Sequence, residues 1–303
     1  MRLVATACLL IAMGSIGAWA SRPSPDPSTT AASDATRPAH RVASASLTAD
    51  EILLALLPPH RIVALGAFSD DPAVSHVADR ARVIAGRVRR DPESVLPLAP
   101  DALFVDPFGL LASRPLLNRL RVPLIELPPV HSFEDVERCI RLVGAAVGRE
   151  RQAEGLVETM QRRLDAVARR VHGRPRPRVL LLGPGGYTAG AGTLFDEQLR
   201  RAAGHNLAVE AGLRGHARIA PERALALDPE VILYTEYRAD ALARPVEPRP
   251  ALADDPLWAG TRAARHGRLV RVEPRELMTT SHHAVALVES LERVLHGPSA
   301  VSH

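Results

Sequence analysis

The fold is indicated by a segment that occurs twice, as ESVLPLAPDALFV at residues 93–105 and as ERALALDPEVILY at residues 222–234. In each copy a glutamate opens a short helix, leucines pack inward, a proline followed by an acidic residue makes a turn, and an apolar strand follows. The offset between the copies is 129 residues throughout. The repeat therefore predicts two lobes of similar structure.

Short apolar runs on either side of the two copies alternate with helical patterns. Runs of this kind, when helices separate them, indicate parallel sheets covered by helices on both faces. Several of them run directly into Gly, Pro or Asp, as strands do where they end at a crevice. The predicted strands are residues 61–65, 102–105, 122–127, 179–182, 231–234 and 269–272.

The longest helical pattern lies between the two groups of strands, at residues 150–171, where apolar residues recur at helical spacing. Ser132, three residues before Asp135, is typical of a helix N-terminus, and the GRPRP segment at 173–177 stops the helix. We therefore expect an α/β protein whose two lobes, each a parallel sheet flanked by helices, are joined by one long helix. The predicted division is an N-terminal lobe at 47–131, an inter-lobe helix region at 132–173, a C-terminal lobe at 174–297 and a tail at 298–303.

All 38 basic residues are arginine, because the sequence contains no lysine. Reactions that need a lysine amine, such as Schiff-base and phosphate-loop chemistry, are thereby excluded. The acidic residues number 34, so the net charge is only +4, and the arginines are interleaved with acids. Together with an aromatic content of 3%, this charge pattern argues against nucleic-acid binding.

The first residues predict export from the cytoplasm. Arg2 is followed by a short apolar stretch and an A-x-A site at residues 18–20, which fits a cleaved signal peptide over residues 1–20 better than an uncleaved anchor. Residues 21–46 are rich in Pro, Ser, Thr and Ala, and we expect them to form a disordered linker. Cys139 would be the only cysteine of the mature chain, so we expect a buried thiol and no disulfide.

This order of elements resembles the substrate-binding proteins of iron-complex and cobalamin ABC importers, a family with two lobes joined by a rigid helix. The resemblance extends from about Thr48 to Gly297. It rests on the order and spacing of several segments, each of which is weak evidence for the family when taken alone. They are ADEILLAL at 49–56, RIVALG at 61–66, the two copies of the repeat, RVPLI at 121–125, IRLVG at 140–144, AGAGTL at 189–194, AAGHN at 202–206 and AARHGRLV at 263–270.

The resemblance implies a monomeric periplasmic receptor, not an enzyme, that captures a metal chelate between its lobes and delivers it to an ABC importer permease in the inner membrane. Glu93 and Glu222 match the glutamates by which the family docks onto arginines of the permease. Two carboxylates on a rigid body would set the orientation and rate of docking. The helix dipole also favours a glutamate at each helix start, but it needs no matching pair. The resemblance implies no cofactor and no metal ion bound by the protein alone.

The ligand would lie on loops that follow the strands, since ligands of α/β sheets bind at that edge. The candidates are Phe68, Asp70 and Phe108 from the first lobe, and Tyr187, Thr188, Tyr237, Arg238 and His282 from the second. Half-buried loop packing is the alternative explanation for each aromatic residue. The chelate stays open between a ferric siderophore, cobalamin and haem, for which Tyr187, Tyr237 or His282 would be the candidate iron ligands.

An exported two-lobed α/β enzyme acting on a small molecule is the alternative function. However, no set of nucleophile, base and orienting group can be assembled, and the G-x-S-x-G motif of α/β hydrolases is missing from the sequence. The glycines at 183–186 fail the spacing of a dinucleotide loop, and His282 and His283 lack the spacing of a zinc motif. The sequence therefore favours a receptor.

Overall fold

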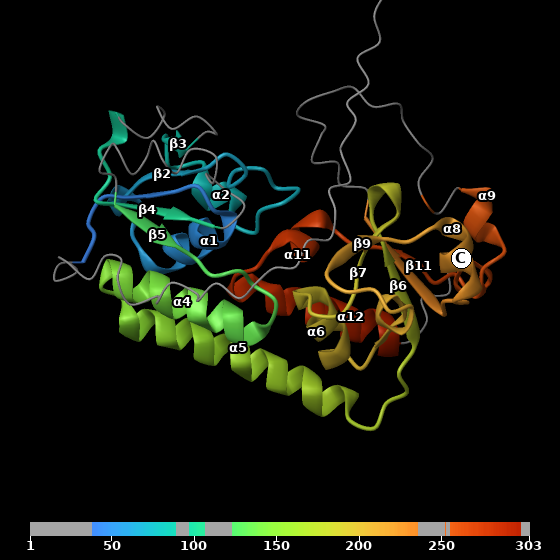
Figure 1. Ribbon diagram of the computed structural model, residues 1–303. Helices are drawn as coiled ribbons and strands as arrows, with labels where there is room; N and C mark the ends of the chain where they lie inside the picture. The colour runs from blue at the N-terminus through green and yellow to red at the C-terminus, as the bar shows by residue number, and fades with distance from the viewer. Residues whose placement is uncertain (1–37, 89–96, 107–122, 236–251, 253–254, 298–303) are drawn as a thin grey trace, which may run out of the picture. The chain divides into compact units, whose positions relative to one another are not determined.

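The computed structural model describes residues 38–88, 97–106, 123–235, 252 and 255–297. Over these residues it contains two parallel sheets flanked by helices, as predicted, and a small antiparallel sheet (Figure 1). No helix in the described ranges has the length and apolar character needed to cross a bilayer.

The first sheet has the strand order β3-β2-β1-β4-β5, and every neighbouring pair is parallel. Its strands are β1 (Val42–Ser44), β2 (Ile62–Gly66), β3 (Arg87–Val88), β4 (Ala102–Val105) and β5 (Leu124–Glu126). The linker predicted for residues 21–46 was wrong at β1, which is the buried middle strand of this sheet. Three residues are too few to show a periodic pattern, so composition alone assigned them to the linker.

The second sheet has the order β11-β10-β6-β8 and is also parallel throughout. Its strands are β6 (Arg178–Leu182), β8 (His205–Asn206), β10 (Val231–Tyr234) and β11 (Leu269–Arg271). The strand β7 (Tyr187–Ala189) pairs in antiparallel fashion with β9 (His216–Arg218). The six strands predicted from apolar runs are confirmed to within two residues at each end.

The repeat in the sequence is also a repeat in the backbone. The pairing of β1 with β4 starts at Ala102, and the pairing of β6 with β10 starts at Val231, which is the same position of the second copy. Ala99 and Asp228, again at matching positions, both have a left-handed backbone, with φ of 39° and 45°. The two sheets therefore share strand order and register around the repeat.

The helix predicted over residues 150–171 is confirmed as α5, which lies beside α4 (Figure 1). Ser132 caps α4, because its hydroxyl accepts a hydrogen bond from the Asp135 amide at 3.2 Å. Gly148 ends α4 with φ of 67°, a conformation that suits glycine.

In the described residues the helices are α1 (Leu47–Leu56), α2 (Ala78–Ala81), α4 (Phe133–Val147), α5 (Glu150–Val171), α6 (Leu194–Arg201), α7 (Leu207–Glu210), α8 (Pro221–Ala226), α9 (Pro256–Ala259), α10 (Arg262–Arg265), α11 (Pro274–Met278) and α12 (Val285–His296), with short 3-10 turns at η1 (Pro59–Arg61), η4 (Pro184–Gly186) and η7 (His282–Ala284).

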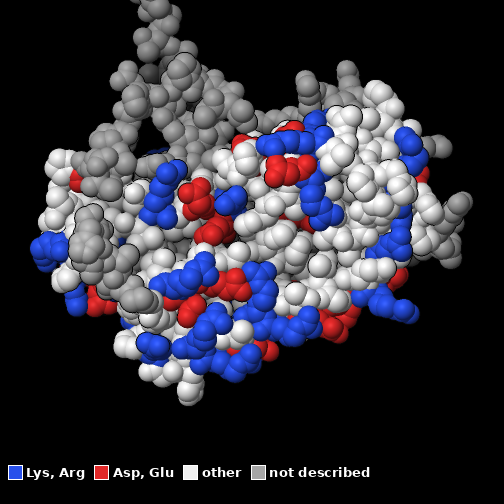
Figure 2. Space-filling model, turned by 180° about the vertical axis from the view of Figure 1, so that it is seen from behind, with Lys and Arg blue, Asp and Glu red and all other residues white. Residues whose placement is uncertain are grey.

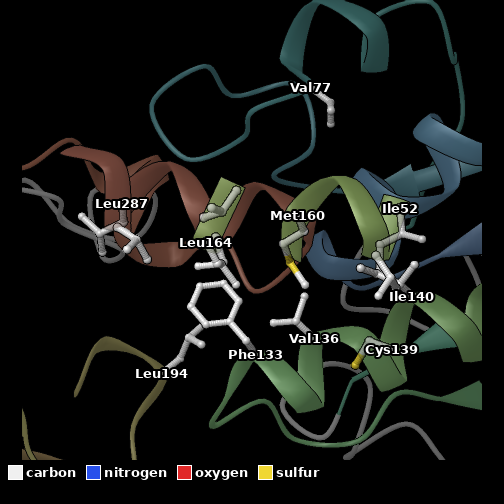
Figure 3. Packing of buried hydrophobic residues seen from close by; sticks show 14 of the residues in the cluster. Ile52, Val77, Phe133, Val136, Cys139, Ile140, Met160, Leu164, Leu194 and Leu287 are labelled. Carbon is white, nitrogen blue, oxygen red and sulfur yellow. The ribbon is translucent and has the colours of Figure 1, made fainter. Parts of the chain in front are cut away.

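One apolar core continues from α1 through α4 and α5 to α6 and α12. Figure 3 shows Phe133 of α4 facing Leu164 of α5 and Leu194 of α6. Cys139 lies in the same core, where burial raises the pKa of its thiol to about 11, so it packs as an apolar residue, as predicted. Because α4 and α5 contribute to the core along their length, they are part of the scaffold that both sheets share.

The outer faces of α4 and α5 carry both basic and acidic side chains, and the face of the molecule seen in Figure 2 shows the same mixture. Arginines pair with glutamates one helical turn away, as in Arg141 with Glu137 and Arg162 with Glu158. Exposed pairs of this type contribute only about 0.3–0.5 kcal/mol each. The helices are thus held mainly by their buried faces.

Candidate ligand-binding site

Some of the residues predicted to bind the ligand or the permease lie outside the described residues. These are Phe108, Tyr237, Arg238 and Glu93. The structure describes the remaining ones, which are Phe68, Asp70, Tyr187, Thr188, His282 and Glu222.

Asp70 lies in the loop of residues 66–76, which follows β2. Its carboxylate accepts two hydrogen bonds from Arg87 of β3, at 2.7 Å from Nη2 and 3.1 Å from Nε. Phe68 is half-buried in the same loop, and its backbone carbonyl accepts a hydrogen bond from the Asp71 amide at 3.3 Å. The Asp70 carboxylate thus fastens the loop to β3.

Tyr187 and Thr188 lie on β7. The Tyr187 side chain is half exposed, and the guanidinium of Arg218 on β9 lies 4.7 Å from the centre of its ring. Thr188 is buried, and within the described ranges its hydroxyl has no hydrogen-bond partner. Tyr187 and Arg218 together present an aromatic face and a positive charge, a combination that suits planar or anionic ligands. Arg218 was not among the predicted site residues.

His282 belongs to a cluster of three histidines from distant parts of the chain. His76 ends the loop after β2, whereas His282 and His283 lie in η7. The rings of His76 and His283 are stacked, with centroids 4.8 Å apart and planes 12° apart. The His282 ring lies 4.1 Å from that of His283, tilted by 37°. We name this group the histidine cluster.

The tautomer of His76 follows from its hydrogen bond. Its Nε2 lies 3.1 Å from the backbone carbonyl of Arg275, and because a carbonyl can only accept, Nε2 carries the proton. In a neutral ring this leaves Nδ1 with a free lone pair. His76 therefore offers an acceptor that can bind a metal or a hydrogen-bond donor.

The three imidazoles are neutral at pH 7. Burial lowers the pKa of His282 to about 4 and that of His283 to about 3, and the other histidines and nearby arginines add to the effect. Burial, followed by the charge of Arg275, also lowers the pKa of His76. Neutral imidazole is the form that ligates metals, so the cluster is in a state suited to that chemistry.

Two neighbouring carboxyl groups on α1, Asp50 and Glu51, are bonded to the two ends of the loop 66–76, and both are fully buried. Asp50 accepts a hydrogen bond from the Gly66 amide at 3.1 Å, and burial raises its pKa to about 8. Burial also raises the pKa of Glu51, whose hydrogen bonds to Ser281 and Thr279 oppose the shift. Neither group was among the predicted site residues, although two adjacent acids in an otherwise apolar helix are a visible signal in the sequence.

No group of three His, Cys, Asp or Glu residues in the described part of the chain is arranged to hold a metal. What the arrangement offers is neutral nitrogen and an aromatic surface. These suit a metal that brings most of its own ligands.

A family model described as periplasmic binding protein matches residues 42–276. The uncharacterized ABC transporter substrate-binding lipoprotein YvrC of Bacillus subtilis (strain 168) is 26% identical over 211 residues, which is 67% of this chain. That match spans 63% of the relative, so it covers less than two thirds of its length.

Many solved structures are similar over most of the chain, among them two that are named as haem-binding proteins. A periplasmic haem-binding protein from Pseudomonas aeruginosa is 27% identical, with a TM-score of 0.69 over 86% of this chain and 94% of that one. The apo form of the periplasmic haem-binding protein RhuT from Roseiflexus sp. RS-1 is 22% identical, with a TM-score of 0.71 over 85% and 98%. At that identity, the similarity to RhuT shows the fold alone.

Proposed function

The chain belongs to the periplasmic binding protein family, and from this premise we propose that it is a receptor that captures a metal chelate and delivers it to the permease of an ABC importer. The observation that carries the proposal is the histidine cluster. It is formed by two segments far apart in the sequence, the loop 66–76 after β2 and the segment 279–283 after α11. We propose that the protein acts outside the cytoplasmic membrane, as the predicted signal peptide requires.

Three chelates are compatible with the site: haem, a ferric siderophore and cobalamin. Haem is the first to test, because the similar protein from Pseudomonas aeruginosa is named as a haem-binding protein and a neutral imidazole is a good ligand for haem iron. Arg218, exposed beside Tyr187, suits the anionic groups that haem and many siderophores carry.

The ligand is identified by titrating haem, cobalamin and a panel of ferric siderophores while following the melting temperature. The chain used should start at residue 38, so that β1 is kept. A ligand at 100 times its dissociation constant adds about 2.7 kcal/mol to the stability of the native state, a readily measured shift. We expect a shift with one chelate class, reduced in a His76→Gln variant and unchanged in a His205→Gln control, since His205 pairs with Glu210 on the surface. A sound melting transition with no shift for any chelate contradicts the proposal.

We propose that Glu222, with Glu93 as its counterpart in the first copy of the repeat, docks the receptor onto the permease. Glu222 is exposed in the first turn of α8, where a partner can reach it. Replacing both glutamates by arginine is expected to abolish transport and to leave the affinity for the chelate unchanged. A Glu150→Arg variant is the matched control, because Glu150 is also exposed in a first helical turn, that of α5. Reduced chelate affinity in the double variant would count against the docking role.

We also propose that the protein carries out no reaction on its ligand. Mass spectrometry of the chelate after long incubation checks this directly, and we expect the ligand to be recovered unchanged. A modified ligand would favour the enzyme alternative.

A further inference from the structure

Glu51 is bonded to both segments that carry the histidine cluster. Its Oε1 accepts a hydrogen bond from the backbone amide of His76 at 3.1 Å. Its Oε2 accepts hydrogen bonds from the hydroxyls of Thr279 and Ser281, each at 2.6 Å. One side chain on α1 thus holds two segments that lie about two hundred residues apart in the chain.

The connection to the second segment continues to His283. The hydroxyl of Ser281, which donates to Glu51, also accepts a hydrogen bond from the backbone amide of His283 at 3.1 Å. Glu51 is therefore bonded directly to the backbone of His76 and, through one hydroxyl, to the backbone of His283. These are the two residues whose rings stack at 4.8 Å.

From this geometry we propose that Glu51 is a positioning residue, which sets His76 and His283 face to face and thereby fixes the two ligand segments relative to each other. The inference about ring position stands on the structure of the free protein. Its consequence for ligand affinity rests on the proposed function.

The carboxylate is suited to this task because it meets three donors with two acceptor oxygens and lies fully buried. A buried donor that loses its acceptor is costly, so each of the three bonds favours the observed arrangement. The hydroxyls of Thr48 on α1 and Thr280 are also bonded to each other, which adds a second contact at the same junction.

A glutamine can replace Glu51 in this network. Its carbonyl oxygen can accept from the His76 amide, and its amide group can donate to the Thr279 and Ser281 hydroxyls, which accept as well as donate. A leucine of similar size can do neither. The pair Glu51→Gln and Glu51→Leu therefore separates the hydrogen-bonding role from the volume of the side chain.

The helix α6 offers a matched control. Its Glu197 also follows an aspartate, and its side chain is mostly buried. The Glu197 carboxylate accepts a hydrogen bond from the backbone amide of Phe133 at 2.8 Å. Phe133 belongs to the scaffold helix α4, and neither residue is part of the histidine cluster. The substitution Glu197→Leu thus removes a comparable bond at a place where no ligand segment is held.

The test is nuclear magnetic resonance of the histidine rings in the ligand-free protein, with the signals assigned by single histidine substitutions. In Glu51→Leu we expect the ring signals of His76 and His283 to move toward those of unstacked histidines, whereas Glu51→Gln and Glu197→Leu keep the wild-type positions. Unchanged ring signals in a folded Glu51→Leu protein overturn the proposal.

A milder variant keeps the test decisive where Glu51→Leu does not fold. Ser281→Ala removes one donor and the link to His283, and we expect the His283 signals to move more than those of His76. If the His283 signals stay in place, the proposed link is wrong.

The effect on binding is tested by measuring the affinity of the same variants for haem, cobalamin and the siderophore panel. Partners that orient a ligating group typically change affinity on the order of tenfold to a hundredfold, and we expect a loss of this size in Glu51→Leu and recovery in Glu51→Gln. If wild type binds none of these chelates, the proposed function fails while the ring signals still decide the role of Glu51. If wild type binds and Glu51→Leu binds equally well, the positioning role in binding is wrong.

Discussion

The helices α1 and α6 occupy equivalent positions beside the two sheets, and both carry an Asp-Glu pair, Asp50-Glu51 and Asp196-Glu197. The surroundings of the two pairs differ. In both, the aspartate bonds to a neighbouring strand of its own sheet, since Asp50 accepts from Gly66 at the end of β2 and Asp196 accepts from Asn206 of β8. In both, the glutamate bonds to a segment outside that sheet. The carboxylates of α6 are paired with arginines, Asp196 with Arg200 and Glu197 with Arg201, whereas those of α1 are fully buried and surrounded mainly by neutral donors.

This difference distinguishes a carboxylate that only stabilises the fold, as on α6, from one that holds the segments of the proposed ligand site, as on α1. An ion-paired carboxylate at the edge of a helix tolerates water and small movements, so it fixes structure at low cost. A buried carboxyl group without a cation is costly and is kept only where its hydrogen bonds are needed. The α1 pair holds both ends of the loop 66–76 and the segment 279–283, which is where the proposed function needs a fixed geometry.

The largest effect on stability is expected when Glu51 is replaced, and Glu197 is the matched comparison. Glu51→Leu leaves three buried donors without an acceptor, at about 1–3 kcal/mol each, so we expect the free energy of unfolding to fall by about 3 kcal/mol or more. Glu197→Leu removes one backbone hydrogen bond and one partly exposed ion pair, and we expect a loss of about 1 kcal/mol. Urea denaturation of both variants measures this. Equal losses would remove the distinction between the two helices.

The pH dependence of stability tests the two aspartates. The pKa of Asp50 is raised from 3.8 to about 8, so between these values the folded state keeps a proton that the unfolded state has lost. Stability therefore falls as the pH rises through this window, by up to about 1.4 kcal/mol per pH unit. The lowered pKa values of His282 and His283 act oppositely, because the unfolded state takes up protons below pH 6.5 and stability rises with pH up to that point.

The histidine contribution is the same in wild type and in an Asp50 variant, so the difference in pH dependence between the two, up to pH 8, reports on Asp50. Asparagine imitates the protonated carboxyl group, and we expect Asp50→Asn to remove the fall in stability that Asp50 causes, while Asp196→Asn keeps it. Denaturation midpoints at pH 6.5, 7.2 and 8 measure the effect. An equal pH dependence of stability in wild type and Asp50→Asn would contradict the burial of Asp50 as the cause.

The scaffold could be predicted from the sequence because its signals are local. The helix α5 and the strand β4 have the predicted ends, since periodic apolar residues and turn residues define them. The strand β1 could not be found in this way. Its three residues form a strand only because β2 and β4 pair with them, which is tertiary information.

The candidate site was predictable only in part, for the same reason. His282 was reached because it follows the predicted strand at 269–272, and the structure places it in the histidine cluster. Its partner His76 and the supporting Glu51 become visible only when distant segments meet. Asp70 lies on the expected loop, but its ion pair with Arg87 shows that position on a loop does not determine whether a side chain faces a ligand.

The smallest expected effect tests whether the two copies of the repeat impose the same backbone. Ala99 and Asp228 both have left-handed φ values, which cost an alanine more than an aspartate, because a short polar side chain tolerates this conformation. We expect Ala99→Gly to raise the free energy of unfolding by about 0.5–1 kcal/mol and Asp228→Gly to change it by less. Urea denaturation with an unchanged slope provides the measurement. A loss of stability in Ala99→Gly would mean that the first copy turns in another way, and that the matching register of β4 and β10 arises without a matching turn before them.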